Sequence, residues 1–430
     1  MPEPDHRQSV PSSLPLNTGR DMLILVLAVL AARACYIAIA GDFVSADLQT
    51  WQALAARMDR GEFVYATTDR LNWPPLWMQI IWLLQRLAGL LHLPHTVVVR
   101  GFLAGCDTVL VLLAYRLARG LVPGTRLFWP LLLGIALHPT FVALTGQHGN
   151  FDVLVAIALV ASMGALAAWQ RTQRPDYWLW ACACLGLGIL AKTIPFVLIP
   201  LLFLGLRRLS ASYRALGALL LLGPVTLGMS VLYVIAPAAI RANVLGYRSF
   251  PGYFGIGGLL NALGASGLMT VFEKAFLPLL LGYLVILGVA LYRRDDLEPR
   301  RILLIAAATL LAIPTLGPGF SVQYIYWFTP LLLLLWHLEP RLRSATVVML
   351  VLALSSTAVV YTFGGDYGAL IAQRTDAEWA WRINAWLVDK PHQTLVFLPL
   401  FAGYVLLLVR MILLCRQPAP GEAPVGAAHA

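Results

Sequence analysis

One carboxylate, Asp47, lies in a polar stretch directly after the first apolar run of the chain. The stretch, residues 41–76, reads GDFVSADLQTWQALAARMDRGEFVYATTDRLNWPPL and carries five acidic residues. A carboxylate at a membrane boundary can accept the proton of a substrate hydroxyl when the two groups are held close together. The structural alternative is a solvated loop acid. The NWPPL segment favours a catalytic role, because two consecutive prolines stiffen the chain where the next helix begins.

A second polar group occupies a break between two apolar runs, in the sequence TGQHGNFD at 145–152. Its side chains Gln147, His148, Asn150 and Asp152 could hydrogen-bond a sugar or contribute to a metal site. His148 and Asp152 are four residues apart, which is not a specific metal-ligand spacing. The structural alternative is that Asn150 or Asp152 caps the helix that follows.

A third candidate is Lys192, within the apolar sequence GILAKTIPFVLIP. An ionisable residue inside a membrane segment is by default a functional candidate. A snorkelling lysine is the structural alternative, but Pro195 beside it indicates a turn that lines a cavity. The compact positive charge of a lysine suits a phosphate group.

Two arginines, Arg241 and Arg248, lie in the Gly- and aromatic-rich stretch RANVLGYRSFPGYFGIGG. Guanidinium groups bind phosphate bidentately, so both are candidates to hold a phosphate or pyrophosphate. The structural alternative is anchoring at the membrane interface by Arg and Tyr.

Further polar residues interrupt other apolar runs. In SVQYIYWFTP at 321–330, Gln323 is the polar exception in what otherwise reads as an aromatic belt. Asp107 lies inside an apolar run and is expected to pair with a neighbouring helix. Arg33, in the first run, is a weaker candidate because its long side chain can snorkel.

These residues are embedded in a chain with a membrane-protein composition. Of its 430 residues, 59% are hydrophobic and 12% are charged, whereas soluble domains carry about 25% charged residues. The net charge of +10 comes almost entirely from arginines, with only three lysines. The arginines cluster between apolar runs, a pattern that orients membrane helices and does not indicate nucleic-acid binding. The five cysteines lie in apolar segments and form no disulfide or zinc pattern.

Apolar periodicity predicts thirteen helical runs. They are 22–40, 74–91, 97–118, 127–145, 151–169, 177–191, 195–206, 215–236, 270–292, 302–316, 325–338, 344–361 and 394–414. Arginine-rich junctions at 116–126, 171–174, 207–214, 293–301 and 339–343 are expected on the cytoplasmic side. Counting runs between these junctions then places the breaks at 145–152, 191–195 and 317–324 together on the outer side.

The same counting requires that one of the two runs after the acidic stretch does not cross. The run 74–91 opens with two prolines and contains Gln79, Gln85 and Arg86, so we expect a juxtamembrane helix. Twelve crossings remain, with cytoplasmic tails at 1–20 and 416–430, the latter disordered. We expect a catalytic membrane module at 21–338 with an outer loop at 41–96. C-terminal membrane helices follow at 339–415, with an outer loop at 362–393.

Five segments, taken in order, resemble the GT-C superfamily of membrane glycosyltransferases. They are ADLQTW…LNWPPL, LAGCDTVLVLLAYRL, LHPTFVALTGQHGNFDVLVA, LGILAKTIPFVLIP and SVQYIYWFTP. The resemblance extends in particular to the catalytic subunit of GPI mannosyltransferase I and to lipid-linked-oligosaccharide glucosyltransferases. It implies an all-α polytopic membrane protein, a bundle of about twelve transmembrane helices with juxtamembrane helices in the first outer loop. It also implies a polyprenyl-phosphate sugar as donor.

The resemblance assigns roles to individual residues. Asp47 matches the first-loop acid that acts as general base, and Asp152 matches the acid of the second site. Lys192 matches a K-x-x-P element, whereas Gln323-Tyr324 and Trp327 match a QY-x-x-W element. The first loop of the mannosyltransferases reads D-x-D, but here Asp47 is followed by Leu48 and Gln49. We therefore expect no cofactor and a metal-independent reaction, although a divalent metal is not excluded by the residues.

Together these observations predict an inverting glycosyltransferase that moves a hexose, with mannose favoured, to a lipid-linked or glycan acceptor. The Arg-, Ala- and Leu-rich composition favours a bacterial inner membrane with a periplasmic active site. The expected partners are the donor, the acceptor and membrane lipids. A transporter or flippase of a lipid-linked sugar is the main alternative, and a polymer ligase or a noncatalytic membrane scaffold is a third. Transport does not require the acid in the first loop, and the chain shows no internal repeat of the kind common in transporters.

Overall fold

The computed structural model describes residues 18–40, 43–68, 71–122, 127–246 and 254–417, and every regular element within them is a helix. Within these residues, eight helices are long and apolar enough to cross a membrane. They are α1 (Thr18–Ala40), α5 (His95–Leu121), α8 (Asp152–Thr172), α10 (Ala211–Ile235), α13 (Ser266–Tyr292), α14 (Pro299–Leu316), α16 (Arg343–Phe363) and α19 (Lys390–Cys415). A further span is bent by 49°. It consists of α6 (Phe128–Leu131) with its continuation η1 (Leu132–Ala136), followed by α7 (Pro139–Gly146).

Three shorter apolar helices complete the bundle. They are α9 (Pro175–Ala191), η2 (Ile194–Phe203) and α15 (Ile325–Leu338), the last preceded by η5 (Val322–Tyr324). A 3₁₀-helix such as η2 rises about 2.0 Å per residue, against about 1.5 Å in an α-helix, so a short segment extends further. Each of the twelve runs expected to cross contains one of these helices, and the all-α polytopic fold is confirmed.

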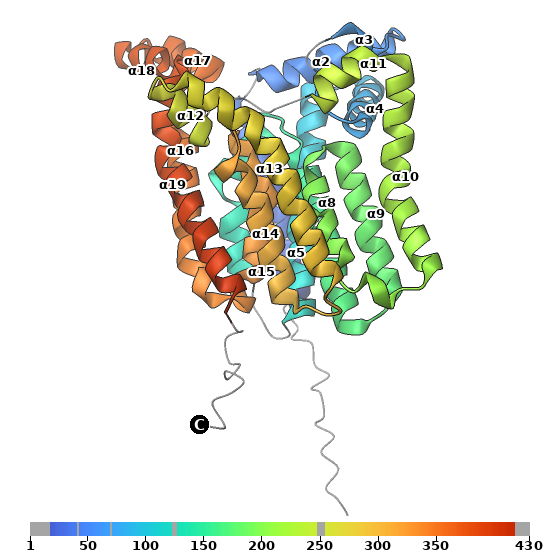
Figure 1. Ribbon diagram of the computed structural model, residues 1–430. Helices are drawn as coiled ribbons and strands as arrows, with labels where there is room; N and C mark the ends of the chain where they lie inside the picture. Colours follow the sequence, from blue (N-terminus) through green and yellow to red (C-terminus); the bar gives the residue numbers. More distant parts are fainter. Residues whose placement is uncertain (1–17, 41–42, 69–70, 123–126, 247–253, 418–430) are drawn as a thin grey trace, which may run out of the picture.

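Most of the remaining elements gather at one end of the bundle, uppermost in Figure 1 and called the loop end below. They are α2 (Ala46–Asp59), α3 (Val64–Thr67), α4 (Pro75–Leu91), α11 (Pro237–Ala239) with η4 (Ile240–Leu245), α12 (Gly255–Ala262), α17 (Gly365–Thr375) and α18 (Glu378–Val388). Helix α4 is the run at 74–91, and it lies with α2 and α3 at this end as expected for a juxtamembrane helix. It begins at Pro75, where a proline costs no intrahelical hydrogen bond.

The arginine-rich junctions meet one another at the opposite end, where α10 begins and α19 ends (Figure 1). Short helices η3 (Leu206–Arg208) and η6 (Pro340–Leu342) belong to these junctions. The contacts that join them are Arg119 with Thr18, Arg171 with the carbonyl of Gly120, Arg208 with Gln173 at 3.2 Å, Arg207 with Asp295 at 3.2 Å, and Arg341 with Gln417 at 2.8 Å. The positive-inside pattern therefore selects a single end of the molecule.

A buried ion pair joins helices in the middle of the bundle. The Nε atom of Arg33 donates to Asp107 at 2.9 Å, and both side chains are fully buried. Thr145 and Tyr326 also donate to the Asp107 carboxylate, at 2.8 and 2.9 Å. Helices α1, α5, α7 and α15 are thereby connected, which confirms that Asp107 pairs across helices. Snorkelling of Arg33 is wrong, because its guanidinium is fully enclosed.

Helices α10 and α13 form part of the outer surface of the bundle. They expose large apolar side chains, for example Leu227 (70%), Val234 (80%), Leu279 (70%) and Ile286 (71%). Such extensive apolar exposure is unfavourable in water but is the normal state of a helix that faces lipid acyl chains. The candidate functional residues lie elsewhere, where the loop end meets the interior helices.

Candidate functional site

The two polar stretches at 43–47 and 147–152 lie against each other at the loop end. Ser45 caps α2 by accepting a hydrogen bond from the backbone of Leu48, and its hydroxyl donates to the carbonyl of His148 at 2.6 Å. Arg100, from α5, is 1% exposed and donates to the carbonyls of Phe43 at 2.7 Å and Gln147 at 3.4 Å. The guanidinium of Arg100 therefore connects the two stretches and holds them next to each other.

Gly149 allows α2 to approach the second stretch closely. Its φ of +71° lies in the left-handed region, which favours glycine. A Cβ atom at this position would lie 2.5 Å from the side chain of Leu48. The indole of Trp51 donates to the carbonyl of Gly149 at 3.2 Å. Gly149 is thus required by its backbone conformation and by the packing of α2.

An aromatic cluster fixes α2 and α4 to the start of α8. Trp77 stacks on Phe151 with ring centroids 4.6 Å apart and planes at 11°. Trp51 makes edge contacts with Trp73, Trp77 and Phe151 at 4.8, 5.7 and 5.9 Å. Aromatic pairs in such geometries contribute about 0.5–1.5 kcal/mol each beyond their buried area. NWPPL therefore serves as a rigid support, through Trp73 and the helix start that follows it.

Asp47 faces His148 across this junction. The Nε2 atom of His148 lies 2.9 Å from Oδ2 of Asp47, and both side chains are about a third exposed, at 29% and 32%. The other ring nitrogen, Nδ1, lies 3.3 Å from the hydroxyl of Tyr361 on α16. A carboxylate, an imidazole and a phenol from three separate segments are thus aligned.

The charges of this pair reinforce each other. Burial acts to raise the pKa of Asp47, but the charge and hydrogen bond of His148, followed by Lys192 and Asn150, outweigh burial and leave the pKa below 3.8. Burial acts to lower the pKa of His148, but Asp47 and, more weakly, Asp152 leave it above 6.5. Between these two values the pair is ionised on both sides.

Lys192 and Asp152 form a second ion pair, and this one is buried. Asp152 is the first residue of α8, and Lys192 is where the chain leaves α9 in an extended conformation. The ammonium lies 2.8 and 3.0 Å from the two oxygens of Asp152, which also accepts the indole N–H of Trp327 at 2.9 Å. The rings of Phe151, Tyr324 and Trp327 surround the ammonium at 5.4, 5.6 and 5.5 Å. Cation–π attraction strengthens when such a cage excludes water.

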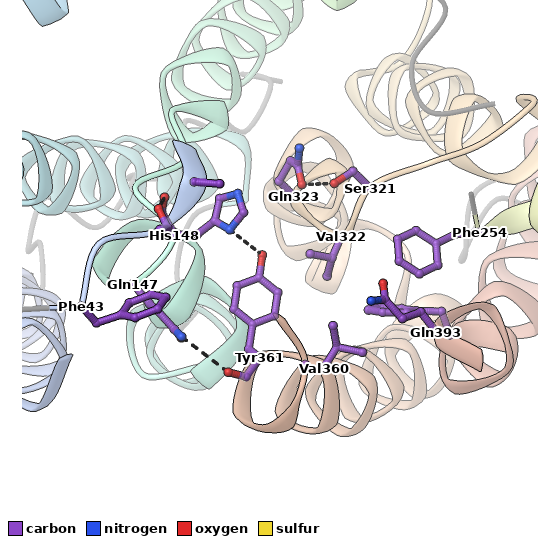
Figure 2. Close-up of a pocket in the computed structure, with 14 residues that line it drawn as sticks. Phe43, Gln147, His148, Phe254, Ser321, Val322, Gln323, Val360, Tyr361 and Gln393 are labelled. Carbon is purple, nitrogen blue, oxygen red and sulfur yellow. Dashed lines mark hydrogen bonds between the residues drawn. The ribbon is translucent and has the colours of Figure 1, made fainter. Parts of the chain in front are cut away.

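A polar cavity of about 270 Å³ opens beside His148. Figure 2 shows His148 and Tyr361 facing each other in its wall, with Gln323 and Gln393 opposite. Its polar lining consists of Ser45, Gln147, His148, Ser321, Gln323, Tyr361 and Gln393, and Phe43, Phe254 and Phe397 add aromatic surface. Amide groups with aromatic rings form a surface suited to a polyhydroxylated molecule.

A larger cavity of about 400 Å³ contains the Lys192 end of the buried pair. Its charged lining is Lys192, Glu273 and Lys274, and its apolar lining includes Phe196, Phe276, Leu277 and Leu280. The segment 317–324 contributes to both cavities, through Ser321 to Gln323 on the polar side and through Tyr324 on the other. Lys192 therefore places a positive charge in the wall of a largely apolar chamber, which Glu273 and Lys274 also line.

The structure brings most of the predicted residues together. Gln147, His148 and Gln323 line the polar cavity, whereas Lys192 and Tyr324 line the larger one. The K-x-x-P and QY-x-x-W elements thus meet in space.

Asn150 and Asp152 lie behind these surfaces. The side chain of Asn150 accepts the backbone N–H of Asp152 at 2.8 Å, which is the capping role considered as the structural alternative. The fully buried carboxylate of Asp152 serves Lys192 and Trp327. Neither residue lines the two cavities.

The expected arginine clamp is not seen at Lys192. Arg241 is exposed, donates to the carbonyl of Pro237 at 3.3 Å and lies 5.8 Å from the ring of Tyr233. It is not among the residues that line either cavity, so its role at the donor phosphate stays a prediction. Arg248 lies outside the described residues.

Several lining residues were not recognised in the sequence. Tyr361 and Gln393 belong to the C-terminal helices, and no local pattern distinguishes them. Lys274 is one of only three lysines and lies within an apolar run, so the rule that selected Lys192 applied to it equally. In the part of the chain that the structure describes, no group of three or more His, Cys, Asp or Glu side chains could hold a metal ion.

Comparison with known proteins identifies the fold. No protein-family model matches the chain, and no curated protein matches it. Among solved structures, ArnT from Cupriavidus metallidurans bound to undecaprenyl phosphate is similar, with a TM-score of 0.52 and 16% sequence identity over 92% of this chain and 76% of that chain. The protein is a polytopic all-α membrane protein. Its fold is similar to that of ArnT.

Proposed function

We propose that this protein is an integral-membrane inverting glycosyltransferase. It transfers a hexose, with mannose favoured, from a polyprenyl-phosphate donor to a lipid-linked or glycan acceptor. The observation that carries the proposal is the position of the Lys192 side chain, in the wall of a largely apolar chamber that shares the segment 317–324 with a polar cavity. The site faces the side of the membrane away from the arginine-rich junctions, which is the periplasm in a bacterial inner membrane.

The donor occupies the larger cavity. Its isoprenoid chain contacts the apolar lining, and its phosphate lies between Lys192 and Lys274. When the bond to the sugar breaks, negative charge grows on the phosphate, and a preorganised ammonium stabilises that charge. The ArnT structure with undecaprenyl phosphate supports this class of donor for the fold.

The acceptor occupies the polar cavity. Its sugar hydroxyls hydrogen-bond the amides of Gln147, Gln323 and Gln393, and the nucleophilic hydroxyl is activated at the Asp47–His148 pair. That oxygen attacks the anomeric carbon in line with the departing phosphate, which inverts the configuration. Lys192 and Lys274 supply the positive charge at the phosphate, so the reaction needs no divalent cation. We therefore expect an excess of EDTA to leave the transfer rate unchanged.

The test is a transfer assay with purified protein in nanodiscs. Radiolabelled polyprenyl-phosphate mannose, glucose and arabinose are each supplied with a crude lipid and glycan extract. Release of polyprenyl phosphate with label in a new product supports the proposal and identifies the sugar. Movement of intact donor between leaflets without consumption would instead identify a transporter or flippase. The variant Asp47→Ala should abolish transfer while the protein remains folded.

A further inference from the structure

His148, and not Asp47, presents the reactive side of the pair to the polar cavity. His148 lines this cavity together with Ser45 and Ala46, whereas Asp47 is not one of its described lining residues. Figure 2 shows the imidazole directed toward the hydroxyl of Tyr361 across the open space. The carboxylate of Asp47 contacts the far nitrogen, Nε2, at 2.9 Å.

We propose that His148 is the catalytic base, which takes the proton from the acceptor hydroxyl, and that Asp47 is a positioning residue behind it. This inference rests on the proposed glycosyl transfer and specifies which group performs the proton transfer. A carboxylate that accepts one N–H of an imidazole fixes the tautomer and stabilises the imidazolium that forms.

The hydrogen bonds determine which atom accepts the proton. Neutral His148 donates its Nε2–H to Asp47, so the lone pair is on Nδ1, where the Tyr361 hydroxyl donates at 3.3 Å. This is a long contact for an O–H donor, so the acceptor hydroxyl can take the place of the phenol. In the reaction the acceptor O–H bond breaks and an Nδ1–H bond forms. The acceptor oxygen bonds to the anomeric carbon as the bond from that carbon to the phosphate oxygen breaks, and the phosphate leaves with the electron pair. His148 then releases the proton to water.

The surrounding charges make His148 sensitive to pH. Asp47 on α2 and Asp152 on α8 both favour the imidazolium, and the hydroxyl of Tyr361 on α16 contacts the other ring nitrogen. Lys192, where α9 ends, acts by its charge on Asp47 and forms an ion pair with Asp152. The pKa of His148 accordingly lies above 6.5. A base must be unprotonated, so activity should fall as the pH drops through this raised value. If Asp47 were the base, the fall would come below 3.8.

The experiment measures kcat and kcat/KM against pH for wild type, His148→Gln and Asp47→Asn, with the donor that the wild type consumes. Asp59→Asn is the matched control, because it lies on the same helix and binds Trp82 and Arg86 away from the cavity. We expect a wild-type acid limb above pH 6.5. His148→Gln should lower kcat by about 10²–10⁴-fold, as for loss of a general base, and abolish the limb. In Asp47→Asn the limb should move to lower pH, and Asp59→Asn should match wild type.

Two results would overturn the assignment. A rate for His148→Gln close to that of wild type would return the role to Asp47. A wild-type profile that stays flat from about pH 5 to about pH 8, the range in which histidine normally titrates, would do the same. If the wild-type protein transfers no sugar from any donor, the proposed function is refuted. The assignment of His148 as the base is then refuted as well, because it rests on that function.

Discussion

Lys192 and Asp152 form a buried ion pair in which the ammonium contacts both carboxylate oxygens, at 2.8 and 3.0 Å. Asp152 is completely buried, whereas the Lys192 side chain is 14% exposed and lines the larger cavity. The carboxylate therefore holds the ammonium from behind while one side remains available to a ligand. The buried carboxylate of Asp152 thus fixes the position from which the Lys192 ammonium would contact the phosphate.

Loss of Lys192 should affect stability and activity separately. In Lys192→Met the Asp152 carboxylate is left buried and unpaired, which typically costs about 3–5 kcal/mol, and transfer should be lost. The double variant Lys192→Met/Asp152→Asn removes the unpaired charge. Thermal unfolding should therefore show recovery of stability in the double variant, while the transfer assay stays negative. Transfer restored in the double variant would show that Lys192 does not bind the donor.

Lys274, rather than Arg241, is expected to assist at the donor. Lys274→Gln removes an exposed cation from the larger cavity. An exposed charge contact contributes up to about 1 kcal/mol, which corresponds to an increase of about fivefold in the KM for the donor. Arg241→Gln is the matched control, since its side chain turns toward Pro237 and Tyr233. Donor titrations of the transfer rate distinguish the two, and an effect confined to Arg241→Gln would contradict this placement.

Gly149→Ala should be destabilising for two reasons that a control can separate. The left-handed backbone costs about 1–2 kcal/mol for a residue other than glycine, and the contact with Leu48 adds about 1–3 kcal/mol of overpacking. Gly264→Ala shares the positive φ, at +70°, but its Cβ would have no neighbour within 4 Å. Thermal unfolding should show a larger decrease for Gly149→Ala. Equal decreases would mean that α2 does not pack on the hinge as described.

The Asp47–His148 pair should make stability depend on pH. His148 has a raised pKa, so its contribution is complete below 6.5 and is lost as the pH rises through the folded-state value. Asp47 has a lowered pKa, so its contribution is present above 3.8 and is lost as the pH falls through the folded-state value. The melting temperature of His148→Gln should therefore fall below that of wild type at about pH 5.5 and approach it at about pH 9. A difference that grows with pH would contradict the pairing.

Most of the fold follows from sequence pattern, since apolar runs and arginine junctions are local features. The run at 74–91 was separated from the crossings by its prolines and by counting, and α4 lies at the loop end. The first two polar stretches were expected on one face, and the hydrogen bond from Ser45 to His148 joins them. Such agreement reflects the lipid environment, which leaves a hydrophobic segment few alternatives to a helix.

The pairings within the site could not be derived in this way. Asp47 and His148 are far apart in the chain, and nothing in either stretch indicates that their side chains meet. Arg33 illustrates the same limit. Its long side chain could snorkel, but the ion pair with Asp107, which is distant in the sequence, makes its burial favourable. Arg241 shows the converse, because a cation in a polar loop can turn away from a site as easily as toward it. Contacts between helices depend on their rotation and tilt, which a single sequence does not specify.

The segment 317–324 forms part of the wall of both cavities. We expect a ligand that shifts this backbone in one cavity to change the shape of the other cavity as well. The two binding events then share a coupling free energy, so that each ligand alters the affinity for the other by the same factor. The dissociation constant of each ligand would therefore depend on whether the other cavity is occupied.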